Sequence, residues 1–380
     1  MRRSLPVLTA LFVLVALPAA ASSSIAKTKV LKTRGNVVAL AADGTRVAAL
    51  TIGIANACDR VVVWTPAKNA LARIATGVDC PNFDGSVDEL NGLALANKRV
   101  AWIEGVGGNT LELSVRSRTL GANRTVTVSS YAENGYGAGE APDGDWVGNI
   151  AGHGSLLAYN RWHACTAYPA TVDPSDYGPH CDQPALGDSQ DYTLSEQTLF
   201  EVVGRSSVEI ASAPDTHAAT FDDAASISIV AVDANRIATL AENGEVTLYS
   251  PAGDVLQQIA VPDGTFAGTA LQGSQLVTLR DGNLELYDVD SGQLVNTIPV
   301  AEGSVLRDLH KGLAVYVLDR EVHVLRLSDE KSVTFSPPGT GTVDAQIEAS
   351  GLFYSYNVAS GLNRGRVVFV PWAKLVQKLG

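Results

Sequence analysis

The stretch RIATLAENGEVTLYSPAGDVLQQIAV (residues 236–261) is followed by a second copy of the same pattern, QLVTLRDGNLELYDVDSGQLVNTIPV (residues 275–300). Each copy predicts three short strands, because two glycine-containing turns interrupt each run of alternating apolar and polar residues. The copies begin 39 residues apart, at Arg236 and Gln275. A fixed period of this size with only strand and turn content indicates repeated β-sheet units.

Further copies are found by their second strand. They begin at Arg46, Arg99, Leu156, Arg236, Gln275, Leu313 and Leu352, so the spacings are 53, 57, 80, 39, 38 and 39 residues. The last four units are compact, and the first three carry insertions. The sequence therefore predicts an all-β fold, a seven-bladed β-propeller with four-stranded antiparallel blades. The predicted blades cover residues 36–77, 91–128, 146–211, 227–262, 266–300, 305–335 and 343–371.

The last unit lacks an outer strand, because the chain ends soon after residues 367–370. At the other end of the chain, residues 28–32 read as a lone alternating strand before the first unit. Pairing these two segments would close the ring and remove two open sheet edges. We therefore predict that residues 28–32 complete the last blade.

The rhythm of the units and the motif LYDVDSG at residues 286–292 resemble seven-bladed propellers of the TolB-like and WD-repeat-like superfamily. The resemblance covers nearly all of the chain after residue 21. Propellers of this kind include both enzymes and binding modules, so the resemblance implies the fold and leaves the activity open.

The N-terminus predicts export. Arg2 and Arg3 precede an apolar run over residues 5–17, and alanines at 19–21 provide a cleavage site, so we predict a signal peptide at 1–21 and a single domain at 22–380. The protein is then secreted or periplasmic. No later stretch is long and apolar enough to predict a membrane span.

Four cysteines in an exported chain are expected to pair. Cys58 and Cys80 flank a predicted hairpin whose tip lies near residues 68–69, which places them opposite each other at its open end. Cys165 and Cys181 enclose a loop of fifteen residues. We predict both disulfides as structural crosslinks.

Charge is distributed unevenly along the chain. The net charge is −12, and loss of Arg2 and Arg3 with the signal peptide makes it −14. This argues against nucleic acid as a partner, because binding phosphates needs a basic surface. Four long insertions, at 78–90, 129–146, 163–191 and 212–226, hold sixteen Asp and Glu and no Lys or Arg. Strand parity places all four at the same end of the propeller.

This acidic, aromatic-bearing loop face is the predicted site. One interpretation is solubilising charge alone. Another is a calcium site, since Ca²⁺ prefers carboxylate and carbonyl oxygens on loops, and its predicted ligands are Asp173, Asp176 and Asp182. A third interpretation is a transition-metal site at His163 and His180. A fourth interpretation is a binding surface for a cationic small ligand, a peptide, a sugar or a protein partner. The predicted ligand-binding residues are Asp143, Asp145, Trp146, Tyr168, Tyr177, Asp188 and Asp191.

No catalytic signature accompanies these residues. A Gly-x-Ser-x-Gly elbow is absent, and the glycine-rich segments match no phosphate-binding pattern. We therefore predict an exported, non-catalytic binding or scaffolding propeller that uses the acidic loop face over blades one to three for a cation, cationic ligand or protein. The alternative is a propeller hydrolase or lyase that uses loop carboxylates, with or without calcium.

Overall fold

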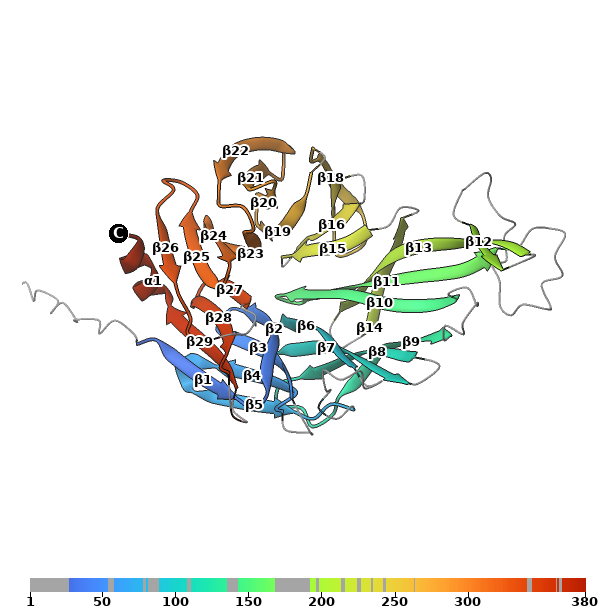
Figure 1. Ribbon diagram of the computed structural model, residues 1–380, viewed down its shortest axis with the longest axis horizontal. Coiled ribbons are helices and arrows are strands. Elements are labelled where there is room, and N and C mark those ends of the chain that lie inside the picture. The colour runs from blue at the N-terminus through green and yellow to red at the C-terminus, as the bar shows by residue number, and fades with distance from the viewer. Residues whose placement is uncertain are drawn as a thin grey trace, which may run out of the picture.

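A computed structural model describes the chain from residue 27 to residue 380. Its description leaves out residues 54–57, 78–79, 81–88, 108–110, 135–142, 168–191, 196–197, 213–215, 224–226, 234, 242–243, 263, 340–343, 360 and 362–363. Antiparallel sheets radiate from a common centre, as in a β-propeller (Figure 1). The all-β fold is thus confirmed.

Five of the sheets are four-stranded blades whose strands follow one another in the order of the chain, apart from one strand of the last blade. The first has β2 (Asn36–Asp43), β3 (Arg46–Ile52), β4 (Val61–Thr65) and β5 (Ala70–Ile74), with the 3₁₀ turn η1 (Pro66–Lys68) before β5. Another has β15 (Ile227–Val232), β16 (Ile237–Ala241), β17 (Glu245–Tyr249) and β18 (Val255–Ala260). The next has β19 (Phe266–Gln272), β20 (Gln275–Arg280), β21 (Asn283–Asp288) and β22 (Gln293–Pro299). The following one has β23 (Val305–His310), β24 (Leu313–Leu318), β25 (Glu321–Arg326) and β26 (Ser332–Phe335). The last has β27 (Asp344–Glu348), β28 (Gly351–Asn357), β29 (Gly365–Pro371) and β1 (Lys29–Thr33).

The remaining sheet corrects the predicted blade number, which is six and not seven. The predicted second and third blades are joined into one nine-stranded sheet. Its strands are β6 (Glu89–Ala96), β7 (Arg99–Gly107), β8 (Leu111–Thr119), β9 (Val126–Asn134), β10 (Asp143–His153), β11 (Leu156–Ala167), β12 (Tyr192–Ser195), β13 (Thr198–Ser212) and β14 (Thr216–Asp223).

The physical reason for the joined sheet is the length of its strands. β9 and β10 run past the body of the propeller and pair with each other, with Asn134 opposite Asp143 and Glu133 opposite Gly144. An unpaired strand edge that extends into solvent is a liability, and this pairing removes it. The segment 212–226, predicted as a loop, contains the strand β14, which pairs with β13. Ala211 lies opposite both Leu157 and His217, so this segment begins at the β10–β11 turn and not at the end of the propeller that holds residues 143–146, which corrects the prediction of one common end.

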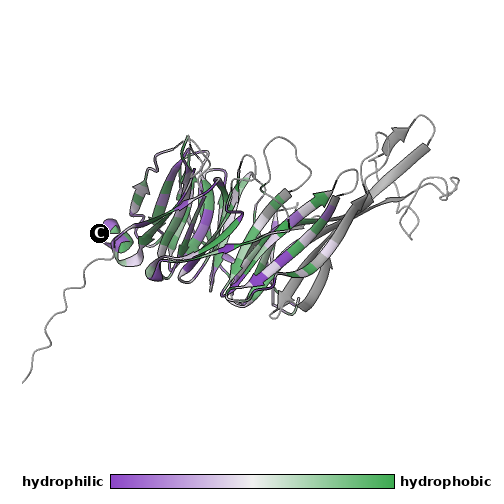
Figure 2. Cartoon of the chain, turned by 90° about the horizontal axis from the view of Figure 1, so that it is seen from below, coloured by the Kyte–Doolittle hydropathy of each residue, from purple (hydrophilic) through white to green (hydrophobic). Residues whose placement is uncertain are grey.

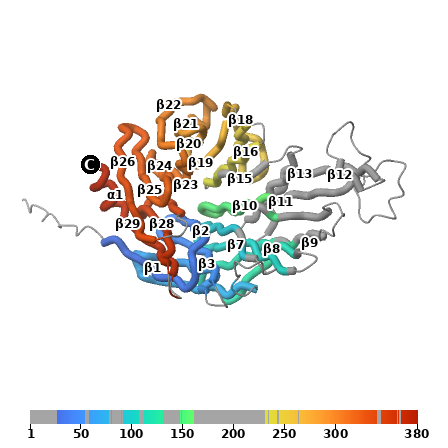
Figure 3. The backbone as a smooth tube through the Cα atoms, viewed as in Figure 1, coloured from blue at the N-terminus to red at the C-terminus, as the bar shows by residue number. Residues whose placement is uncertain are grey.

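The predicted closure of the ring is confirmed. β1 pairs antiparallel with β29 over five residue pairs, from Lys29 opposite Phe369 to Thr33 opposite Gly365. Figure 3 shows β1 in blue beside β28 and β29 in red. The N-terminal strand therefore supplies the fourth strand of the last blade, and no open edge remains there.

The core lies between neighbouring blades, where apolar residues of facing sheets meet. Trp102 of β7 is fully buried and packs with Leu50 of β3 and Leu93 of β6. Tyr159 and Tyr316, at the equivalent strand position in other units, are 2% and 9% exposed. In Figure 2 hydrophobic and hydrophilic positions alternate along the strands, as expected where one strand face meets the next blade.

One helix ends the chain. α1 (Trp372–Leu379) buries Leu375 and Leu379 and lies against β26, β28 and β29 of the last two blades. Within the described residues, no helix has the length and apolar character needed to cross a bilayer.

Candidate functional site

A cavity of about 150 Å³ lies on the central axis of the propeller. Its lining comes from the first strand of every repeat unit, namely β2, β6, β10, β15, β19, β23 and β27. The apolar part of the wall is mainly Ala, Leu and Ile, and the polar part includes Arg307, Asp308, Gln346, Glu348 and His153. The cavity is thus a space that all repeat units share.

The unpaired edge of each inner strand faces this axis, so its N–H groups need acceptors from outside its own sheet. Side chains of the neighbouring blade supply them. Asp308 of β23 accepts from Ile347 N at 2.7 Å, and Asp344 of β27 accepts from Leu40 N at 2.9 Å. These carboxylates therefore have a structural role, which is to join one blade to the next.

A ring of seven residues lies where each inner strand meets its tight turn, and two of them, His153 and Glu348, line the cavity. The ring consists of Asp43, Ala96, His153, Asp233, Gln272, His310 and Glu348, which are polar except for Ala96. Most follow one rule, in which the side chain accepts the N–H of the next turn around the ring. Asp233 accepts from Gly273 N at 3.2 Å, and Gln272 accepts from Lys311 N.

Asp43 follows this rule and makes one further contact, because the next ring position is an alanine. Its Oδ2 accepts from Asn97 N as the rule requires, and it also accepts from Gly154 N at 2.9 Å, one inner strand further on. Ala96 has no acceptor of its own to offer Gly154. The short side chain of Ala96 therefore lets Asp43 reach towards β10 and its last residue, His153.

Three of the ring residues come together as a result, and we call Asp43, His153 and Glu348 the mouth cluster. One oxygen of each carboxylate and one imidazole nitrogen all lie within 4.8 Å of one another. The His153 Nε2 atom is 3.8 Å from Glu348 Oε1. The two carboxylates are buried, at 9% and 6% exposed, and the His153 side chain is partly exposed at 35%.

Electrostatic crowding is strongest at Glu348. Burial, and then the negative charges of Asp308 and Asp43, raise the pKa of Glu348 to about 8, although N–H groups of Gly44 and Ala349 oppose the shift. Burial likewise raises the pKa of Asp308 to about 7, against the N–H bonds from Ile347 and Leu309 and with a further contribution from Asp344. Such carboxyls retain a proton near neutral pH unless another positive charge replaces it.

The two histidines of the ring add nitrogen atoms to this region. Burial, together with the charges of Lys311 and His153, lowers the pKa of His310 to about 4. Among the described residues, His153 Nδ1 and His310 Nε2 are buried side-chain nitrogens without a hydrogen-bond partner. Unsatisfied buried polar atoms are rare and call for an explanation.

Most of the residues predicted from the sequence lie elsewhere. Tyr168, Asp173, Asp176, Tyr177, Cys181, Asp182, Asp188 and Asp191 fall outside the described residues, as does His180. Asp143, Asp145 and Trp146 lie in β10, and Cys165 lies in β11. For these four residues the structure describes the backbone and not the side chain. They belong to the end of these strands away from the mouth cluster. The acidic loop face therefore stays a prediction, as does the Cys165–Cys181 pair.

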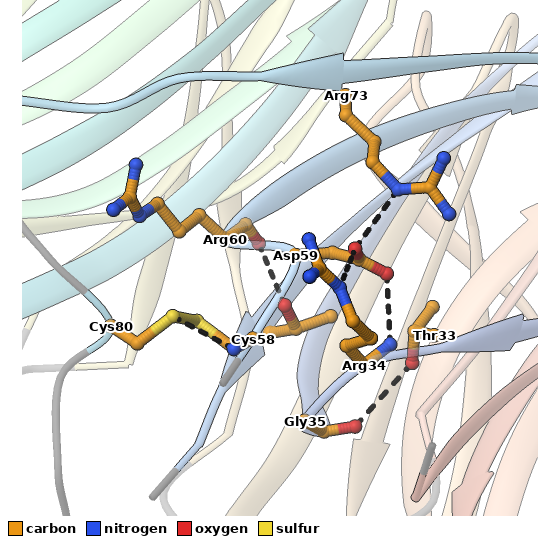
Figure 4. Close-up of a disulfide and its surroundings, with 9 residues drawn as sticks. Thr33, Arg34, Gly35, Cys58, Asp59, Arg60, Arg73 and Cys80 are labelled. Carbon is orange, nitrogen blue, oxygen red and sulfur yellow. Dashed lines mark hydrogen bonds and ion pairs between the residues drawn. A yellow bond between two sulfur atoms is a disulfide. The ribbon is translucent and has the colours of Figure 1, made fainter. Parts of the chain in front are cut away.

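The Cys58–Cys80 disulfide is confirmed, with a Cα–Cα distance of 5.7 Å. Figure 4 shows it beside Asp59, whose carboxylate receives Arg34 N at 2.8 Å, Arg34 Nε at 3.0 Å and Arg73 Nε at 2.9 Å. Burial alone would raise the pKa of Asp59, but these hydrogen bonds outweigh it and lower the pKa. Arg34 follows the closing strand β1, so the network links that strand to the first blade.

Gly35 allows this close approach of the chain to the disulfide. Its φ of +78° is unfavourable for other residues, and a Cβ atom there would lie 2.7 Å from the Cβ of Cys58 and 2.3 Å from the carbonyl oxygen of Ile52. The turn between β1 and β2 therefore requires glycine at this position.

Replacing both Cys58 and Cys80 with alanine is expected to lower the free energy of unfolding by about 3 kcal/mol, as for a closed loop of this length. Urea denaturation of the oxidised protein would measure the change. The paired substitution isolates this bond from any effect of Cys165 and Cys181. An unfolding midpoint equal to that of the unchanged protein would show that the Asp59 network, and not the disulfide, holds this corner.

Comparison with known proteins supports the fold. No protein-family model matches the chain, and no curated protein matches its sequence. The β-propeller domain of the Trilobed protease from Pyrococcus furiosus matches with a TM-score of 0.53 and 8% identity, over 91% of this chain and 98% of that domain. That domain has an open Velcro topology, whereas β1 pairs with β29 here.

Acylaminoacyl peptidase matches the fold of the chain to a similar degree. Its complex with Z-Gly-Gly-Phe-chloromethyl ketone gives a TM-score of 0.53, and the uncomplexed Pyrococcus horikoshii enzyme gives 0.52, both at 8% identity. Each match covers 89% of this chain and 51% of that chain, so the chain spans about half the length of the peptidase. At this identity the likeness extends to the fold and no further. The chain has a β-propeller fold that resembles the folds of these solved structures.

Proposed function

We propose that the chain is an exported, non-catalytic binding propeller that holds a small cation or a small cationic group at the axial mouth cluster. The observation that carries this proposal is the closeness of Asp43 and Asp308 to Glu348, which lines the shared cavity. The class of ligand agrees with the one expected from the sequence. The site differs, because the expected residues lie on the loop face.

The size of the cavity restricts the ligand. Pockets for drug-sized molecules measure roughly 300–1,000 Å³, and this one measures about 150 Å³. This is space for several water molecules. A hydrated ion or a short amine fits, whereas a folded peptide or an oligosaccharide does not.

The charge of the lining favours a positive ligand. Arg307 Nε lies 3.9 Å from Asp344 Oδ1, so this cation is directed to a carboxylate other than those of the mouth. Glu348 and Asp308 carry raised pKa values because they are buried near one another and near other carboxylates. A bound cation would relieve that repulsion and would replace the protons that these groups otherwise retain.

The acidic loop face remains a second candidate surface. Its four segments hold sixteen acids without a basic residue, and the joined sheet extends the strands that carry part of them. The negative electrostatic field of these segments attracts cationic partners from solution. We propose that any protein or peptide partner binds there, because the axial cavity is too small for one.

Thermal unfolding of the oxidised mature protein with Ca²⁺, Zn²⁺ or ethylenediamine tests the proposal. A ligand at a hundred times its dissociation constant adds about 2.7 kcal/mol to the stability, so at least one of these cations should raise the melting temperature saturably. The paired change Asp43→Asn and Glu348→Gln should weaken this effect at least tenfold. Both amides keep an oxygen for the N–H bonds, so the fold is expected to survive.

The loop variant Asp173→Asn, Asp176→Asn and Asp182→Asn serves as the matched control, and it should respond to cations as the unchanged protein does. The opposite pattern, a response lost in the loop variant and kept in the mouth variant, would place the cation on the loop face. No response to any of the three cations would reject small-cation binding altogether.

A further inference from the structure

We propose that Asp43, His153 and Glu348 bind a divalent transition-metal ion of the zinc type. The inference rests on the proposed function, because it narrows the small cation to a metal that accepts both oxygen and nitrogen ligands. It names a site at the turn-bearing end of the propeller, the end of β10 opposite to Asp143, Asp145 and Trp146.

The donor set selects this kind of metal. Two carboxylate oxygens and one imidazole nitrogen suit Zn²⁺ and related ions, whereas Ca²⁺ and Mg²⁺ take oxygen ligands almost exclusively. The three donor atoms lie within 4.8 Å of one another, and the Nε2 atom of His153 is 3.8 Å from Glu348 Oε1. Ligands of a tetrahedral zinc ion lie roughly 3.4 Å apart at bond lengths of about 2.05 Å. Side-chain adjustments of about 1 Å would therefore complete the site.

The carboxylates are held in place by the backbone around them. Asp43 uses Oδ2 for the N–H groups of Asn97 and Gly154, which leaves Oδ1 to face a metal. Glu348 receives the N–H groups of Gly44 and Ala349. Metal-binding carboxylates are commonly oriented by hydrogen bonds of this kind, and such partners strengthen binding.

His153 supplies the nitrogen donor of the site. Its Nε2 atom lies 3.8 Å from Glu348 Oε1. Its Nδ1 atom has no hydrogen-bond partner among the described residues, so the ring could turn either nitrogen to a metal without losing a hydrogen bond at Nδ1. A metal on one nitrogen would fix the ring and its tautomer, as in other protein sites.

Three protein ligands leave a fourth position of a tetrahedral ion for water. Because Glu348 and His153 both line the axial cavity, that position would open into it. Zinc sites with three protein ligands and one exchangeable position bind small molecules directly. The cavity would then hold any small molecule that binds at this fourth position, and its volume would limit the size of that molecule.

The test is a Zn²⁺ titration of the oxidised mature protein against a chromophoric chelator, with ethylenediamine and Ca²⁺ measured in parallel. One saturable Zn²⁺ site per chain is expected. His153→Gln and Glu348→Gln should each weaken it by at least about 100-fold, because even loss of an outer partner costs 10–100-fold. Asp233→Asn, which removes a carboxylate from an equivalent ring position, should leave Zn²⁺ affinity unchanged.

Bound Co²⁺ gives a second measurement, since its visible absorption depends on ligand type and geometry. The spectrum should change in His153→Gln. Binding of Ca²⁺ or ethylenediamine that needs Glu348, without Zn²⁺ binding that needs His153, would overturn the metal site and leave the proposed function standing. Zn²⁺ binding unaffected by both substitutions would also overturn it, and absence of all cation binding would overturn both.

Discussion

Deleting residues 26–33 is expected to lower the free energy of unfolding by roughly 3–5 kcal/mol, because each ladder hydrogen bond contributes about 1 kcal/mol net. The deletion removes β1, which pairs with β29 over five residue pairs. It also exposes the edge of β29 and uncovers the core on which Leu31 packs, which includes Phe353 and Phe369. A fall in melting temperature of roughly 4–7 °C follows from the entropy of unfolding for a domain of this size.

Differential scanning calorimetry would measure the fall, and a peptide would provide the control. A peptide of residues 26–33 added in trans should restore part of the lost stability, because an extended segment can pair with an open sheet edge. The same peptide with proline in place of Leu31 should not, since proline cannot donate to the ladder. An unchanged melting temperature after the deletion would show that β1 adds nothing to ring closure.

The closure of the ring could be predicted from the sequence because a strand is missing from the last unit. The last unit has no outer strand, and a strand without a partner lies at the opposite end of the chain. The number of blades could not be predicted from the sequence. The pairing of Asn134 with Asp143 lies at the ends of long strands in two units. Turn residues show where strands begin and end, and they do not reveal that two neighbouring units share a ladder.

The mouth cluster was missed because its residues stand far apart in the chain and next to turns that look unremarkable. Asp43, His153 and Glu348 each precede a tight turn, and an Asp before Gly is ordinary turn chemistry. The repeat did contain a signal. Aligning the units places these residues at one equivalent position, which is polar in every unit except at Ala96. Equivalent positions of a propeller converge on its axis, so this alignment could have located the ring.

The three-residue contact itself was beyond the sequence. It depends on the small side chain of Ala96, which leaves Gly154 N for Asp43 to bind. It also depends on which oxygen of Asp43 the backbone uses. The site was predicted on the acidic loops because a high density of charge can be read from a sequence. The burial of side chains, and their convergence in space, cannot be read in this way.

With a chelator present, raising the pH from 6.5 to 8.5 is expected to lower the free energy of unfolding by about 2 kcal/mol, at about 1.4 kcal/mol per proton and pH unit. The pKa of Glu348 is raised from 4.5 to about 8 in the folded protein, and that of Asp308 from 3.8 to about 7. The folded state therefore holds protons that the unfolded state has lost, and stability falls as pH rises through these values. His310 has a lowered pKa of about 4 and is neutral in the folded state, whereas the unfolded imidazole is half protonated at pH 6.5, so its contribution offsets about 0.4 kcal/mol of the fall.

Urea denaturation at several pH values would measure the slope, and the Glu348→Gln variant should flatten it. An amide cannot ionise, so the repulsion from Asp43 and Asp308 disappears, and the variant should be more stable than the unchanged protein at pH 8.5. Asp233→Asn removes a carboxylate at an equivalent ring position and should keep the full slope. Stability that rises from pH 6.5 to 8.5, or an equal slope in Glu348→Gln, would mean that Glu348 is ionised in the folded protein at neutral pH. The crowding of carboxylates at the mouth would then be offset by a charge other than a bound proton.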